Sequence, residues 1–207
     1  MPVSKPVEVS HAAELPYLQQ IFDELRRGKH LAQDDGPHVH ALREHEQHYT
    51  RLFSSLGFTL IQHTRGFFYF AADSSSGVTE LAARMAVFTF ILVEHLADHG
   101  EQVENSLMTK MFNVTELPHL TTDRFMAYMR DVGVTSLEDL RQILKNMRRL
   151  GFAELTGDDL FRFRTPAYRF LDLCAELASE QEDGTTEDTP PSPAEDTEDD
   201  DLEGVDA

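Results

Sequence analysis

One order of elements is predicted twice in this chain of 207 residues: helices, a glycine, two short apolar strands and a further helix. In each half the helical periodicity ends at a glycine, Gly57 or Gly151, and β-branched or aromatic residues follow it. The four strands are expected at 58–61, 67–71, 152–155 and 160–163. Two helices followed by a β-hairpin wing make a winged helix, a helix-turn-helix variant. The sequence therefore predicts a mostly α (α+β) chain of two tandem winged-helix domains.

Charge separates a C-terminal tail from the rest of the chain. The sequence has 37 acidic and 18 basic side chains, a net charge of −19. Thirteen acids and no Lys or Arg lie in 180–207, which leaves 24 acids, 18 bases and a net charge of −6 in 1–179. A segment with so few apolar residues cannot offset the entropy of ordering, so we expect disorder there. The predicted divisions are a flexible leader at 1–13, a first winged-helix domain with a linking helix at 14–99, a second winged-helix domain at 100–178 and the acidic tail at 179–207.

The linking helix is the most apolar part of the chain. It is expected to run from a cap at 74–76 to about Asp98, and it is apolar on nearly every face between Met85 and Val93. Such a helix is buried, here either between the two halves or between two chains. The apolar stretch is far shorter than the roughly 20 residues that cross a membrane, so we expect a soluble, cytoplasmic protein without a membrane partner. Whether the segment from Val39 to Leu56 forms one helix or two is left open.

The residues that usually carry catalysis are not arranged for it in this sequence. It contains no phosphate-binding glycine loop, no dinucleotide fingerprint and no Gly-x-Ser-x-Gly elbow. The lone Cys174 lies among leucines, which favours a small buried hydrophobe over a nucleophile. Four histidines near the second helix are interpreted as a polar face, because their spacing misses the His-Glu-x-x-His zinc motif; they are His38, His40, His45 and His48. We expect no enzymatic activity, no cofactor and no metal, and a histidine-based metalloenzyme is the least favoured alternative.

A basic face is predicted on the helix at 136–150. Its apolar stripe faces the core, and four cations lie away from that stripe: Arg141, Lys145, Arg148 and Arg149. In a helix-turn-helix module this would be the recognition helix, and its cations would contact DNA phosphates or base edges. The neighbouring wing has Asp158 and Asp159 at its tip, where they would repel phosphate. An ordinary solvated helix face therefore remains an open alternative.

The first hairpin and the linking helix supply a candidate partner surface. Both faces of the two-stranded ribbon are apolar, whereas a wing that gripped DNA would have a polar, basic outer face. Such a ribbon needs a second surface to cover it, which is either the core of the same chain or another protein. The candidate residues for dimer or partner contact are Phe58, Phe67, Phe68, Tyr69, Phe70, Phe88 and Ile91.

Several runs resemble a known family across roughly residues 15–177. They are Leu56-Gly57-Phe58, the segment 65–70, the apolar segment 86–94, Leu150-Gly151-Phe152 and the segment 164–170. They resemble the MksE/MukE family, the small non-SMC subunits of bacterial MukBEF-like condensins. The acidic tail is outside the resemblance.

The resemblance implies an architectural role. Members are kite proteins: tandem winged-helix subunits, usually homodimeric, that clasp a kleisin of the MksF/MukF type. The kleisin bridges the heads of an SMC-type ATPase of the MksB/MukB type. We therefore expect a nucleoid-associated, non-catalytic subunit with weak DNA contact inside the complex, acting in chromosome organisation and segregation or in plasmid defence.

A dimeric winged-helix transcription regulator is the alternative from another class. It would read a palindrome through the helix at 136–150. The acidic wing tip and the net negative body weigh against it, because specific sites rest on strong phosphate contacts.

Overall fold

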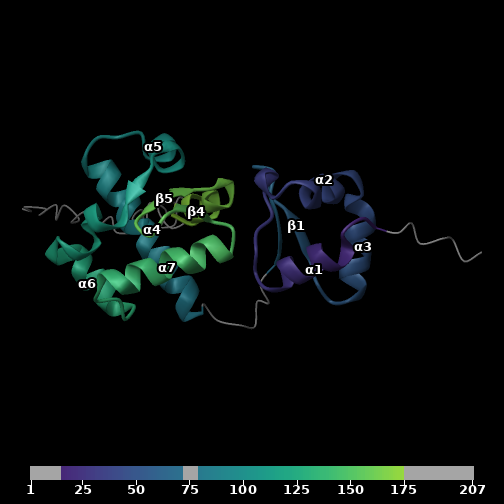
Figure 1. The fold of residues 1–207 in the computed structure, drawn as a ribbon, viewed down its shortest axis with the longest axis horizontal. Coiled ribbons are helices and arrows are strands. Elements are labelled where there is room, and N and C mark those ends of the chain that lie inside the picture. Colours follow the sequence, from purple (N-terminus) through teal and green to yellow (C-terminus); the bar gives the residue numbers. More distant parts are fainter. Residues whose placement is uncertain (1–14, 72–78, 175–207) are drawn as a thin grey trace, which may run out of the picture.

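The computed structural model describes residues 15–71 and 79–174, which form two hydrophobic clusters side by side along the long axis of the molecule (Figure 1). Helices predominate, and the strands form two small antiparallel sheets, which confirms the mostly α, α+β prediction. The predicted leader, the acidic tail and the cap expected at 74–76 lie outside the described residues.

The first half, residues 15–71, contains three α-helices, one short 3-10 helix and one hairpin. Its hairpin pairs Leu60 with Phe70, and its core forms where the helices cover that hairpin. The helical segment left open by the sequence is two helices, because the chain breaks at His45. The elements are α1 (Leu18–Arg26), the 3-10 helix η1 (Gln33–Asp35), α2 (Pro37–Glu44), α3 (Glu46–Ser55), β1 (Leu60–Gln62) and β2 (Phe68–Phe70).

The second half, residues 79–174, has more helices than the first and a three-stranded sheet in the order β3-β5-β4. Strand β3 was not predicted, because two residues are too short to show alternation. After η4 the chain is helical up to Cys174. The elements are α4 (Glu80–Asp98), α5 (Val103–Thr109), β3 (Phe112–Asn113), η2 (Val114–Glu116), η3 (Pro118–Leu120), α6 (Asp123–Asp131), α7 (Leu137–Arg149), β4 (Ala153–Thr156), β5 (Leu160–Phe163) and η4 (Thr165–Ala167).

Side-chain caps define where α4 and α7 begin. A capping box begins α7: Ser136 Oγ accepts from the Asp139 N–H at 3.2 Å, and Asp139 Oδ2 accepts from the Ser136 N–H at 2.9 Å. Thr79 caps α4 by accepting from the Ala82 N–H at 3.2 Å, so this helix starts later than expected.

Helix α4 packs with the second half, although we expected it to complete the first domain. Its buried residues Met85, Phe88 and Leu92 belong to the cluster that also contains the core side of α7. Periodicity indicates that this helix is buried but not against which partner. None of the helices in the described ranges is long and apolar enough to cross a membrane.

Candidate functional site

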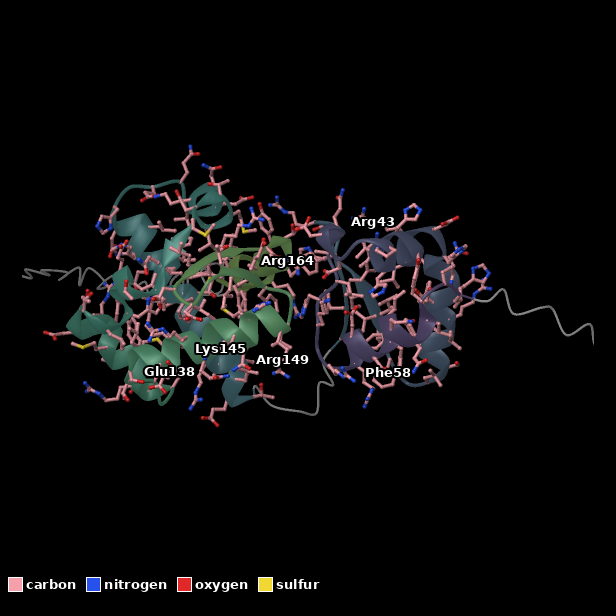
Figure 2. All side chains as sticks on the ribbon, in the orientation of Figure 1. Arg43, Phe58, Glu138, Lys145, Arg149 and Arg164 are labelled. Carbon is pink, nitrogen blue, oxygen red and sulfur yellow. The ribbon has the colours of Figure 1, made fainter. Side chains whose placement is uncertain are left out.

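The predicted basic face is present on α7. Its apolar side is buried in the core, while Lys145, Arg148 and Arg149 are exposed and Arg141 is half-buried. Glu138, Lys145 and Arg149 lie in that order along α7, and Arg149 lies at the end of the helix that is beside the first half (Figure 2). The amphipathic pattern and the capping box therefore place all four cations on one helix, as the sequence indicated.

Carboxylates neutralise part of this face. Asp159, in the turn between β4 and β5, accepts from Arg141 Nε at 2.9 Å, and its Oδ1 lies 2.8 Å from Arg141 Nη2. The hydrogen bond that Arg141 donates to Asp159 holds the pKa of the Arg141 guanidinium above its ordinary value. Glu138 Oε1 accepts from Lys145 Nζ at 3.3 Å. A phosphate would have to displace these carboxylates, so Asp159 and Glu138 compete for the cations that DNA would use.

A groove of about 470 Å³ lies between α7 and the β4–β5 turn. Three cations and three acids line it, so it has no strong net attraction for a polyanion. Its charged residues are Glu138, Arg141, Lys145, Arg148, Asp158 and Asp159.

His30 is the centre of a joint between the two halves. Its backbone N–H donates to the Leu150 carbonyl at 2.9 Å, and its ring lies between Tyr69 and Phe152, with centroids 5.0 and 4.5 Å away. Arg169 Nη1 donates to Nε2 at 2.9 Å, and Nδ1–H donates to the Gly28 carbonyl at 3.1 Å. Burial, with the Arg169 cation, lowers the pKa of His30 to about 3. The ring is therefore neutral, and each nitrogen has a partner.

Charged side chains close the same joint from another side. Arg164 Nη2 donates to Asp35 Oδ2 at 3.0 Å, and both side chains are nearly buried, 13% and 11% exposed. Lys29 Nζ lies 3.1 Å from the other Asp35 oxygen. Burial by itself would raise the pKa of Asp35, but the Ala32 N–H and the two cations outweigh it and lower that pKa. Arg164 lies between the two halves in Figure 2.

The first hairpin is bound to the second half as well. His63 Nε2 lies 2.9 Å from Asp172 Oδ2, and the Arg65 guanidinium stacks over the Tyr168 ring at 4.1 Å. Arg65 also donates to Glu104 at 3.0 Å. One face of the ribbon therefore packs on its own helices, and the other packs on the second half.

This packing buries part of the predicted partner surface within the chain. Phe67, Phe68, Phe88 and Ile91 are fully buried within the chain, so their side chains are not exposed to a partner. Both apolar faces of the ribbon are covered by the chain itself. The other candidates, Phe58, Tyr69 and Phe70, are half-buried.

The histidine-rich stretch is dispersed by the fold. His38 Nδ1 lies 3.0 Å from Glu24, and His40 pairs with Glu44 on the exposed side of α2. Within residues 15–71 and 79–174, no group of three His, Cys, Asp or Glu side chains is placed to hold a metal ion. Cys174 is half-buried, and burial raises the pKa of its thiol.

Sequence reasoning missed the residues that join the halves. Arg164 is more than a hundred positions away from His30 and Asp35, and no local period links it to them. The only signal was the run 164–170, which contains Arg164 and Arg169 and carried part of the family resemblance.

Comparison with known proteins agrees with that resemblance. A family profile described as "Condensin complex protein MksE" matches residues 16–175, and the chain belongs to this family. It is similar to the chromosome partition protein MukE of Shigella flexneri, 23% identical over 171 residues that cover 77% of this chain and 75% of that protein. The MukE of Vibrio cholerae is 26% identical over 178 residues, covering 80% and 76%. This chain is therefore a condensin complex protein.

Proposed function

We propose that this protein is the non-catalytic kite subunit of a MukBEF-like, Mks-type condensin. It dimerises and binds a kleisin of the MksF/MukF type, through which it is connected to an SMC-type ATPase of the MksB/MukB type. The observation that carries this proposal is the family match over 16–175, the same range in which the helix, helix, hairpin order occurs twice. The protein acts in the cytoplasm on the nucleoid, in chromosome segregation or plasmid defence.

Two winged-helix modules provide the architecture in this proposal. In the first, α2 and α3 precede the β1–β2 wing, and in the second, α6 and α7 precede the β4–β5 wing. Strand β3 pairs with β5 and extends the second wing into a sheet. The domain limits of 14–99 and 100–178 move in consequence, because α4 shares its core with the second module.

The partner surface uses apolar side chains that remain accessible. Phe58 and Phe70 stack at 4.9 Å and are half-buried, and Leu56, two positions before Phe58 in the chain, is 55% exposed. On α4, Phe90 is 42% exposed and lies near Tyr128. We assign kleisin or dimer contact to these positions together with Tyr69, because exposed aromatic side chains are typical of protein interfaces.

DNA contact is weak and dependent on salt. Of the four cations on α7, Arg141 and Lys145 are paired with acids of the same module, so Arg148 and Arg149 carry most of the free positive charge. Fewer free cations release fewer counterions when DNA binds, so affinity outside the complex is low.

A tagged pull-down from native lysate, read by mass spectrometry beside light scattering of the pure protein, tests the proposal. Recovery of a kleisin and a coiled-coil ATPase with a dimeric bait is expected, and the Leu56→Ser/Phe90→Ser variant should lose one or both contacts. A matched change at exposed polar positions, Thr109→Ser/Gln142→Ser, should retain them. Recovery of neither partner, while the dimer shifts one specific duplex at physiological salt, would identify a transcription regulator instead.

A further inference from the structure

Four exposed arginines gather where two helices from different halves end. Arg26 and Arg27 are at the C-terminal end of α1, and Arg148 and Arg149 form the last turn of α7. We call these four residues the joint arginine cluster. Arg149 lies at the end of α7 that faces the first half, where α1 also ends (Figures 1 and 2).

The two helix ends are held together by the backbone. Two contacts to Leu150 join these ends. A Cβ on Gly28 would lie 3.4 Å from Leu150 Cδ2, and two residues further along the chain the His30 N–H donates a hydrogen bond to the Leu150 carbonyl. With standard bond lengths, the Cα atoms of Arg27 and Arg149 are therefore at most about 16 Å apart. Two extended arginine side chains span that distance, so one anionic segment can contact both pairs.

The acids around the joint are already engaged by other cations. Glu24 and Asp35 both bind Lys29, and Asp35 also binds Arg164. Arg26 has only a long contact to Asp23, at 3.9 Å. Across the ranges that the structure describes, Arg27, Arg148 and Arg149 have no carboxylate within 4 Å. The helix dipole favours cations at the C-terminal ends of α1 and α7, but it leaves the charge of these arginines exposed to solvent.

The chain itself contains a segment of matching charge. Residues 180–207 carry 13 carboxylates and no Lys or Arg. The described structure ends at Cys174, in the helix from which Arg169 bonds to His30 and Asp172 bonds to His63, so this end lies close to the joint. Thirty-three residues follow Cys174 and reach roughly 100 Å when extended, far more than is needed.

We propose that the acidic segment 180–207 binds the joint arginine cluster within the same chain and so competes with external polyanions. A tethered segment has an effective concentration in the millimolar range, which allows even weak ion pairs to be occupied. The contact screens the free charge of α7 until another anion displaces the segment. This inference rests on charge and geometry and does not depend on the condensin proposal.

Paramagnetic relaxation in the full-length protein tests the contact. A spin label is attached at Ser192→Cys in a Cys174→Ala background, and amide signals are recorded with the label oxidised and reduced. At low salt we expect broadening at residues 26–29 and 148–151. The broadening should disappear at about 0.5 M salt, where the Debye length is about 4 Å.

Two variants separate a specific contact from general attraction. Arg148→Glu/Arg149→Glu should abolish the broadening, whereas the control Arg51→Glu/Arg130→Glu changes the net charge equally on α3 and α6 and should retain it. Should the first variant unfold, neutralisation of the tail serves instead. It comprises Glu195→Gln, Asp196→Asn, Glu198→Gln, Asp199→Asn, Asp200→Asn and Asp201→Asn.

Binding of a DNA duplex tests whether the joint arginine cluster is occupied by the tail or by nucleic acid. The neutralised tail should raise affinity for a random duplex several-fold at low salt. The proposal is overturned if the joint amides are not broadened, or if the broadening survives in Arg148→Glu/Arg149→Glu. It is also overturned if duplex binding needs Arg148 and Arg149 but ignores the tail, which would assign the cluster to nucleic acid alone.

Discussion

Two buried histidines are held neutral by their surroundings. His119 is fully buried; its Nε2–H donates to the Phe88 carbonyl at 2.9 Å, while Nδ1 accepts no hydrogen bond from the described residues. Burial lowers the pKa of His119 to about 4 and, with Arg169, that of His30 to about 3. A proton on either ring would place an uncompensated charge in an apolar site.

We expect stability to fall as the pH falls below 6.5. In the unfolded chain both rings bind a proton near pH 6.5, whereas in the folded chain they do so only near 3 and 4, so acid favours unfolding. Each histidine should lower the free energy of unfolding by about 2 kcal/mol at pH 5 relative to pH 7. Urea denaturation at the two pH values measures the difference in free energy of unfolding.

A matched pair of variants assigns this effect to its residues. His119→Gln should reduce the pH 7 to pH 5 difference by about half, whereas His40→Gln, at a position where the side chain is 82% exposed, should leave it unchanged. If both variants lost the same stability between pH 7 and pH 5, residues other than His119 would cause the acid sensitivity.

At the scale of elements, α7 and the β4–β5 hairpin act as one charged unit. Asp159 binds Arg141 directly, so the wing tip reduces the positive charge that the helix presents. Asp158→Asn/Asp159→Asn should therefore raise affinity for a random duplex by about threefold to tenfold at low salt. Fluorescence anisotropy over a salt series measures it. Asp123→Asn/Asp131→Asn on α6 is the control of equal charge, and an equal gain there would mean that only net charge matters.

The start of α7 depends on its capping box. Ser136→Ala removes a hydroxyl that accepts from the Asp139 N–H, and we expect it to cost about 1 kcal/mol of unfolding free energy. Thr122 is at the N-cap of α6 but makes no side-chain cap hydrogen bond. Thr122→Ala should therefore cost only a few tenths of a kcal/mol. Similar losses in chemical denaturation of the two variants would contradict the structural role given to Ser136.

On the scale of the whole molecule, Gly151 sets how closely the halves approach. Its φ is +87°, and a Cβ there would lie 2.4 Å from the His30 carbonyl oxygen. Gly157 has a similar φ of +71°, but a Cβ would meet open space. Both glycine-to-alanine changes cost roughly 1–2 kcal/mol of backbone strain, and Gly151→Ala should cost a further 1–3 kcal/mol because backbone must move.

Hydrogen exchange locates the consequence of that change. In Gly151→Ala we expect faster exchange at the His30 amide, whose hydrogen bond to the Leu150 carbonyl crosses the joint, and at the adjacent Leu31 amide, which bonds to Phe68 within the first half. Gly157→Ala should leave those amides protected. Protection that is unchanged in Gly151→Ala would mean that the joint adapts without opening.

Much of the fold could be predicted because local chemistry determines it. Gly57 and Gly151 end helices at positive φ, Ser136 and Asp139 form a capping box from residues three positions apart, and both hairpins lie close to their expected positions. The basic face of α7 followed from its period. These features depend on neighbours within a few residues, and such neighbours are visible in a sequence.

Tertiary structure alone decided which surfaces these elements cover. Apolar periodicity showed that α4 and the first hairpin must be buried, but not that α4 joins the second core or that the hairpin is enclosed by its own chain. Arg164 and Asp35 are 129 positions apart, and their ion pair exists only because two helix ends and a wing converge. Burial is a property of composition and spacing, whereas the identity of the covering partner depends on chain topology.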